Sequence, residues 1–266
     1  MDLKLKTRYG KTALIAGASE GIGAAFSKLL ASEGINLVLL ARRELLLREF
    51  ARTLEKYNVD ITCIAADLSD DTAAAEIKEK LNEKEIDILV YNAALSHIGP
   101  FNNDLKDKHM KMAQVNMLSP LNMIHLFGQE MLNRGRGAVI LMSSLAGLQG
   151  SAFISMYSAT KAFNRVLGES LWYEWKEKGV DVMACLAGST STPGFIESKP
   201  GKMGFFAPRV QKPEEVADEC LRKLGKQPSL ITGRGNRLAS FFMQRFLSRK
   251  MAVKIMGDNT KKIYRL

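Results

Sequence analysis

Tyr157 and Lys161 are the residues whose types and spacing point most directly to chemistry in this 266-residue chain. Side chains four positions apart share one face of a helix, so the lysine ammonium can lie beside the tyrosine phenol. A neighbouring cation favours the phenolate and lowers the pKa of a tyrosine from its usual value of about 10. The pair therefore predicts a general acid or base, although the same spacing also arises by chance in amphipathic helices.

Two further polar residues could take part in the same reaction. Ser144 follows the apolar run AVILMS, at the carboxyl end of a candidate strand, where open α/β sheets bind their ligands. Asn116 lies in a long helical pattern over 105–132 and offers an amide that could hold a water molecule. No metal is predicted, because the histidines and cysteines lack the spacing of metal ligands.

The elements that must position these residues follow a regular alternation. Short, nearly continuous apolar runs alternate with longer helical patterns, which is typical of strand–helix–strand units in a buried parallel sheet. The expected strands are 12–17, 36–41, 61–66, 86–91, 138–143, 180–186 and 229–233. The expected helices are 22–33, 43–57, 70–83, 105–132, 155–178 and 213–225. The length and the 46% apolar content suit a single α/β domain over 1–266.

The turn after the first strand reads GASEGIG and opens a helix. Its glycines, Gly17, Gly21 and Gly23, allow a tight turn and a close approach of the backbone to a pyrophosphate, which amides at the helix N-terminus can bind. Its position at the first strand–helix junction favours a nucleotide site over a simple tight turn. Glu20 and Ile22 belong to the same expected cofactor loop.

The second strand leads into Arg42 and Arg43, and no acidic residue occupies its end. An acid there would bind the ribose hydroxyls of NAD, whereas an arginine favours the 2′-phosphate of NADP. Ser19 could donate its hydroxyl to that phosphate. Glu20 argues against this assignment, because many NADP-preferring enzymes have a basic residue in the glycine loop. The arginine pair nevertheless predicts NADP(H) as the cofactor.

The ends of the third and fourth strands offer further cofactor contacts. Asp67 could hydrogen-bond the adenine with Leu68 packed beside it, or Asp67 could instead cap the next helix. Asn92, Ala93 and Ala94 form a turn of small residues that we expect beside a cofactor ribose.

The motifs occur in a characteristic order: GASEGIG, ADL, YNAA, Asn116 in QVNMLSP, the serine pair before LAG, and Tyr157-Ser-Ala-Thr-Lys161. In this order and spacing the chain resembles the short-chain dehydrogenase/reductase family over residues 10–233. The resemblance implies a Rossmann-type, doubly wound, seven-stranded parallel sheet flanked by helices, with NAD(P) as cofactor. Two departures are Ala94, where the family often has glycine, and Ala187, where it usually has proline.

The resemblance also implies a role for each of the four catalytic candidates. Tyr157 would donate a proton to the substrate oxygen as hydride arrives from the nicotinamide, and Ser144 would orient and polarise the carbonyl. Lys161 would lower the pKa of the tyrosine and bind the nicotinamide ribose. Asn116 would position a water that relays protons through Lys161. The cofactor set implied after the sixth strand is Gly188, Thr190 and Thr192.

Within the family, the chain resembles bacterial NADP-dependent hydroxysteroid dehydrogenases of bile acids, especially the 7β type. This likeness lies in residues 212–236 and in the stretch after the sixth strand, and it implies interconversion of a secondary alcohol and a ketone on an apolar substrate. A 3-oxoacyl or long-chain ketone reductase is the alternative. A non-enzymatic NADP-binding sensor is a third interpretation, which retention of all four catalytic candidates disfavours.

Loop 187–212 is expected to act as a substrate lid, because it mixes turn residues with large apolar side chains. The other interpretation is that the loop simply packs on the protein surface and does not cover a ligand. The large apolar side chains of the loop are Phe195, Met203, Phe205 and Phe206.

The net charge of +10 is concentrated in the C-terminal extension 234–266, which has nine basic residues and one acid. Residues 236–256 are helical in composition without a clean apolar face, which favours contact with protein, as in a homodimer or homotetramer, over peripheral contact with an anionic membrane. Nucleic acid is not expected, because no known binding module accompanies the charge. Three scattered cysteines and the lack of a secretory or membrane-spanning apolar run indicate a cytoplasmic protein.

Overall fold

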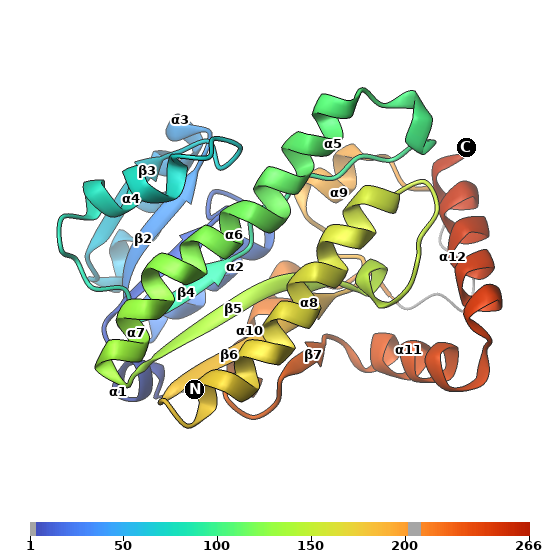
Figure 1. Ribbon diagram of the computed structural model, residues 1–266. Coiled ribbons are helices and arrows are strands. Elements are labelled where there is room, and N and C mark those ends of the chain that lie inside the picture. Colours follow the sequence, from blue (N-terminus) through green and yellow to red (C-terminus); the bar gives the residue numbers. More distant parts are fainter. Residues whose placement is uncertain (1–3, 202–208) are drawn as a thin grey trace.

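The computed structural model describes residues 4–201 and 209–266, which build a parallel sheet covered by helices on both faces (Figure 1). The strands are β1 (Thr12–Ala16), β2 (Asn36–Ala41), β3 (Ile61–Ala65), β4 (Ile88–Tyr91), β5 (Gly137–Ser144), β6 (Val180–Ala187) and β7 (Ser229–Ile231). They form one seven-stranded sheet in the order β3-β2-β1-β4-β5-β6-β7, and every neighbouring pair is parallel. The predicted fold class and all seven predicted strands are confirmed.

The strand order reverses at β1, which pairs with β2 on one side and with β4 on the other. Successive crossovers therefore run in opposite directions from this point and leave a crevice at the carboxyl ends of β1 and β4. The glycine turn after β1 and the small-residue turn after β4 both open into this crevice.

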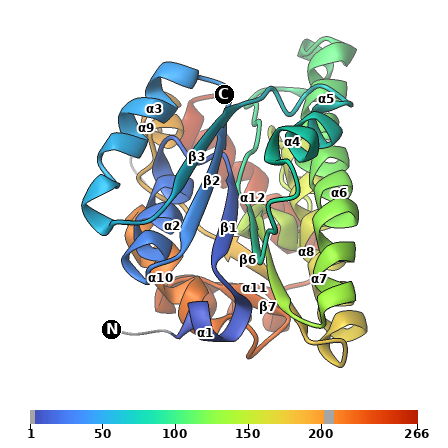
Figure 2. The same cartoon turned by 90° about the vertical axis from the view of Figure 1, so that its left-hand side faces the viewer.

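The helices lie in two layers (Figure 2). One layer contains α1 (Leu5–Tyr9), α2 (Gly21–Ser32), α3 (Glu44–Arg52) and α10 (Pro213–Lys223), and the other contains α4 (Ala73–Leu81), α5 (Lys106–Ala113), α6 (Ser119–Met123), α7 (Gln129–Arg134) and α8 (Ser155–Lys176). Alternate residues of β1 face opposite layers: Ala13 and Ile15 pack with α2 and α10, and Leu14 and Ala16 pack with the other layer. The strands are consequently buried on both faces, which explains their continuous apolar runs.

The predicted helix 105–132 is a helical run from α5 to α7 that contains two wide π turns, Gln114–Leu118 and Ile124–Gly128. Pro120 explains the first, because it has no N–H to donate to the carbonyl of Asn116 four residues earlier. Asn164 of α8 donates its side-chain amide to that carbonyl instead, at 3.1 Å. The irregular turn therefore fixes Asn116 against α8.

The C-terminal extension differs from the single helix expected over 236–256. It forms α11 (Arg234–Phe246) and α12 (Arg249–Tyr264), separated where Ser248 caps α12 by accepting a hydrogen bond from the Met251 amide. Four large apolar side chains of α11 share one exposed face, each 52–67% exposed: Leu238, Phe241, Phe242 and Phe246. The exposed Arg245 lies among them on the same side of the helix, so this face is not cleanly apolar, in line with the expectation.

Loop 187–212 is closed at its base by a bridge between Thr190 and Gln211, and it contains the short helix α9 (Pro193–Glu197). Met203, Phe205 and Phe206, on which the lid prediction partly rests, lie outside the described residues. Across the described ranges, none of the helices combines the length and the apolar character that crossing a bilayer requires.

Candidate active site

A cavity of about 960 Å³ opens at the carboxyl ends of the central strands and extends to the C-terminal helices. The predicted site residues that line it are Gly17, Ser19, Glu20, Gly21, Ile22, Arg42, Arg43, Asp67, Leu68, Asn92, Ala93, Ala94, Ser144, Tyr157, Lys161, Gly188, Thr190 and Thr192. Gly23 and Asn116 are buried and do not line this cavity. The fold thus gathers residues from six separate strand ends and from α8 around one space.

The glycine turn is shaped for close backbone approach. Gly17 has a φ of 78°, and its carbonyl accepts a hydrogen bond from the Asn92 side chain at 3.0 Å. A Cβ on Gly23 would lie only 2.0 Å from the Gly17 carbonyl oxygen, so α2 can begin this close to the turn only with glycine there. The N-cap residue of α2, Glu20, makes no side-chain capping bond, which leaves the first amides of the helix to a ligand. These features fit a dinucleotide pyrophosphate.

The two arginines at the end of β2 are in different electrostatic situations. The Arg43 guanidinium lies 2.7 Å from the Glu20 carboxylate, and both side chains are partly exposed. Arg42 is exposed at the same rim and forms no ion pair with any described residue. Glu20, which the sequence marked as unfavourable to a phosphate, is therefore held by Arg43, and Arg42 is the more available cation.

Tyr157 and Lys161 share one face of α8, with the Lys161 Nζ 5.6 Å from the centre of the tyrosine ring. The lysine side chain is only 3% exposed and donates to the Met142 carbonyl at 2.8 Å. Burial lowers the pKa of Lys161 to about 8, because a charged ammonium is poorly solvated there.

Burial raises the pKa of Tyr157, although its hydrogen bond with Ser144 opposes the rise and the neighbouring Tyr264 adds to it. This direction is opposite to the lowering expected from Lys161. The physical reason is that the ammonium is aimed at Met142, while burial disfavours the phenolate. A phenol with a raised pKa stays protonated at neutral pH and can serve as a proton donor.

Asn116 is fully buried, and its side chain is engaged by protein groups. It donates to the Leu95 carbonyl at 2.8 Å and to the Thr160 hydroxyl at 3.0 Å, and it accepts from the Leu95 amide at 2.8 Å. Both amide protons are used, so the side chain cannot donate to a water as the sequence interpretation allowed. Its position joins the turn after β4 to α8.

The C-terminal helices supply a wall of the cavity that the sequence did not indicate. The residues of this C-terminal wall are Asn236, Ala239, Ser240, Met243, Met256, Asn259, Thr260, Lys262, Ile263 and Tyr264. Arg249, at the start of α12, donates to the Leu148 carbonyl at 3.0 Å, and the Gly201 amide donates to the Ile263 carbonyl at 2.8 Å. No local sequence signal could reveal this wall, because it depends on where a distant helix packs.

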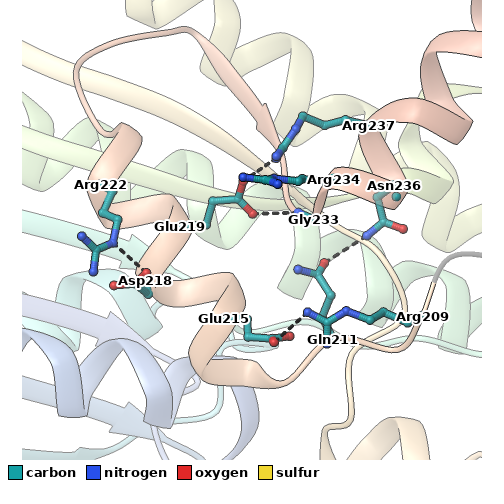
Figure 3. Close-up of a pocket in the computed structure, with 11 residues that line it drawn as sticks. Arg209, Gln211, Glu215, Asp218, Glu219, Arg222, Gly233, Arg234, Asn236 and Arg237 are labelled. Carbon is teal, nitrogen blue, oxygen red and sulfur yellow. Dashed lines mark hydrogen bonds and ion pairs between the residues drawn. The ribbon is translucent and has the colours of Figure 1, made fainter.

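A second, smaller cavity of about 460 Å³ marks the junction of α10 with α11 (Figure 3). Glu219 of α10 accepts a hydrogen bond from the Gly233 amide at 2.7 Å and pairs with Arg237 of α11. Arg209 and Arg222 are likewise paired with acids on α10. The contacts of Glu219 therefore fasten α11 to α10, whereas the other two ion pairs neutralise charge beside the junction.

Comparison with known proteins agrees with this geometry. The short chain dehydrogenase family matches residues 11–202, so the chain belongs to this family of dehydrogenases. A 7beta-hydroxysteroid dehydrogenase of Mediterraneibacter gnavus is 34% identical over 238 residues, which are 88% of this chain and 90% of the relative. A very-long-chain 3-oxoacyl-CoA reductase of Rattus norvegicus is 31% identical over 227 residues, which are 83% of this chain and 70% of the relative.

Solved structures extend the comparison to three dimensions. The structure from a study of 7beta-hydroxysteroid dehydrogenase stereoselectivity has a TM-score of 0.89 at 31% identity and covers 96% of this chain and 99% of its own. A short-chain dehydrogenase from Sphingobium yanoikuyae in complex with NADPH has a TM-score of 0.74 at 28% identity, covering 84% of this chain and 87% of its own.

Proposed function

We propose that this protein is an NADP(H)-dependent oxidoreductase that interconverts a secondary alcohol and a ketone, with a hydroxysteroid of the bile-acid type as its substrate. The observation that carries the proposal is the shared cavity. Ser144 and Tyr157 face a space with the glycine turn and the arginine rim at one end and apolar side chains from α11 and α12 at the other. Such a cavity can hold a dinucleotide and a large apolar ketone together.

The proposed chemistry assigns the proton to Tyr157. When bound, NADPH supplies a hydride to the substrate carbon, and NADP⁺ accepts one in the reverse direction. The protonated phenol gives its proton to the carbonyl oxygen as the alcohol forms, and Ser144 donates a hydrogen bond that orients that oxygen. Lys161 carries positive charge below a pH of about 8, and in the proposed chemistry this cation favours loss of the phenolic proton. Asn116 acts as a positioning residue through its bonds to the turn after β4 and to α8.

The comparisons support NADP(H) and a steroid in different ways. The Sphingobium relative was solved with NADPH, and Arg42 offers this chain a cation for the 2′-phosphate. The 7beta-hydroxysteroid dehydrogenase structure matches 96% of this chain. The described part of the proposed lid also lines the cavity, through Phe195 and Ser198 among others.

A 3-oxoacyl or long-chain ketone reductase is the second candidate, supported by the identity to the rat 3-oxoacyl-CoA reductase. Oxidation of NADPH measured at 340 nm with 7-oxo bile acids and with 3-oxoacyl-CoA compounds separates the two. We expect turnover of the 7-oxo bile acids at least about 10-fold more efficient, since placing a rigid apolar body is worth several kcal/mol. Preference for the acyl compounds would reject the steroid assignment, and NADPH binding without any turnover would favour a sensor.

We also propose that the protein is a homodimer or homotetramer. The exposed apolar face of α11 is the feature that supports this, because four large side chains at more than half exposure are unusual on a surface that faces only water. Two basic side chains of the extension are already engaged within the protein. Arg237 forms an ion pair with Glu219, and Arg249 donates a hydrogen bond to the Leu148 carbonyl. Less of it is therefore available to a membrane.

A further inference from the structure

The substrate end of the cavity contains a single formal charge among its described lining residues. The other charged side chains that line the cavity lie at the cofactor end or beneath Tyr157; they are Glu20, Arg42, Arg43, Asp67 and Lys161. Beyond Tyr157, the wall is made of apolar and small polar side chains, with Lys262 of α12 as the exception. An apolar wall with one cation is the lining expected for a ligand that is apolar over most of its surface and negatively charged at one point.

The position of Lys262 is set by the residues around it. The next residue, Ile263, is held through its carbonyl by the Gly201 amide at 2.8 Å, and the start of α12 is held by Arg249 on the Leu148 carbonyl. The preceding helix, α11, is fastened through Glu219 as Figure 3 shows. The cation is therefore presented by an anchored helix.

The Lys262 ammonium is also available to a ligand. Its side chain is exposed, and within the described ranges no acidic residue forms an ion pair with it. In this it differs from Arg43 and Arg237, whose charges are already matched by acids. An exposed ammonium pays its desolvation penalty only when a ligand arrives, and an anionic ligand group compensates for it.

We propose that Lys262 is the binding site for an anionic group of the substrate, remote from the reacting oxygen. The inference rests on the proposed function, because it takes the cavity to hold an alcohol or ketone. The anion would be the side-chain carboxylate of a bile acid, or a phosphate if the ligand is a coenzyme A thioester. The substrate is thus defined as an amphipathic anion, and its charged end lies toward the end of α12.

A simpler role for a lysine in the last turn of a helix is to stabilise the partial negative charge of the helix C-terminus. Lys261 lies in the same turn and is exposed, but it does not line the cavity. Replacing Lys261 therefore removes the same helix contribution without touching the substrate wall. It is the matched control for Lys262.

The test compares Lys262→Met with Lys261→Met in the full-length protein, using a 7-oxo bile acid and the methyl ester of the same compound. We expect the ratio of kcat/KM for the acid over that for the ester to fall about 3- to 10-fold in Lys262→Met, through KM, because the contact is remote from the reacting atoms. Lys261→Met should keep the wild-type ratio, and Lys262→Arg should restore most of it. High salt should reduce the difference.

An unchanged acid-to-ester ratio in Lys262→Met together with an unchanged kcat/KM for 3-oxoacyl-CoA, or the same fall in Lys261→Met, would overturn the proposal. Failure of the proposed function gives a different result, since wild-type protein would then turn over neither acid nor ester. Running 3-oxoacyl-CoA beside the bile acid identifies the source of the anion. If Lys262→Met lowers the acid-to-ester ratio for the bile acid, the anion is a carboxylate. If it lowers kcat/KM for 3-oxoacyl-CoA alone, the anion is a phosphate and the substrate belongs to the acyl class.

Discussion

At the scale of single residues, the proposed chemistry depends on a phenol whose proton is retained. Burial holds the pKa of Tyr157 above its usual value, and Ser144 is its hydrogen-bond partner. Replacing Tyr157 by phenylalanine removes the acidic proton and little volume. We expect ketone reduction to fall about 10²- to 10⁴-fold, the usual contribution of a general acid, with NADPH binding retained. The measurement is steady-state NADPH oxidation beside a fluorescence titration of NADPH, and wild-type turnover in the variant would remove Tyr157 from the mechanism.

The pH dependence follows from Lys161 and Tyr157 together. Burial lowers the pKa of Lys161 to about 8, so the ammonium loses its charge as the pH rises through that value. Loss of the cation disfavours release of the phenolic proton, and kcat/KM for ketone reduction should decline above a pH of about 8. Alcohol oxidation needs the phenolate, whose fraction increases with pH even after the cation is lost, so kcat/KM for oxidation should rise with pH. Profiles of kcat/KM in both directions test this, and a reductive rate that increases from pH 7 to 9 would contradict it.

The cofactor rim leads to a prediction that separates the two arginines. Arg42→Ala should raise the KM for NADPH about 10- to 100-fold and that for NADH little, because it removes a charge-assisted contact with the 2′-phosphate. Arg43→Ala should have a smaller effect, since Arg43 is paired with Glu20. Arg48→Ala is the control, an exposed arginine paired with Glu44 outside the cavity. Equal effects of Arg42→Ala on both cofactors would disprove the NADP preference.

At the scale of elements, the substrate wall depends on how α11 is fastened to α10. Glu219→Gln keeps the shape of the side chain but removes the charge that binds Arg237 and the Gly233 amide. We expect a lower Tm, by about 2–5 °C, because a partly exposed charged contact contributes about 1 kcal/mol. The KM for the substrate should rise as well, since α11 carries part of the wall.

Asp218→Asn is the neighbouring control for this prediction. Asp218 pairs with Arg222 within α10 and does not hold α11. Its loss should change the Tm by less than about 2 °C and leave the substrate KM near its wild-type value. If both variants behave alike in calorimetry and in kinetics, the junction is not what positions the wall.

At the scale of the whole molecule, the exposed face of α11 is the surface most suited to association. We expect the protein to elute as a dimer or tetramer and the Phe241→Ser, Phe246→Ser double variant to elute as a monomer, because the two substitutions remove apolar contact area. Size-exclusion chromatography with light scattering measures this. Leu45→Ser, at an even more exposed position on α3, should not alter the assembly.

Pelleting with anionic liposomes tests the competing use of the same face. If the wild-type protein is monomeric and binds such vesicles, and the double variant no longer binds them, peripheral membrane contact replaces the oligomer. The apolar face and the basic charge of the extension are both present, so only the occupant of the face distinguishes the two outcomes.

The sequence alone determined the features that depend on neighbours along the chain. Apolar runs bounded by turns predicted all seven strands. The GASEGIG motif predicted a tight turn, and close backbone contacts at Gly17 and Gly23 do require glycine there. The i, i+4 spacing predicted that Tyr157 and Lys161 share a face of α8. These outcomes follow from steric rules and periodicity, which act over a few residues.

Only the tertiary structure decided what depends on burial and on distant partners. The pKa of Tyr157 is raised rather than lowered, because burial outweighs a lysine that is directed at Met142. The Asn116 amide is consumed by Leu95 and Thr160. The extension forms two helices and a wall of the cavity because α11 is bound to α10 and α12 to the loop after β5. Desolvation and long-range packing set these features, and neither is written in local sequence.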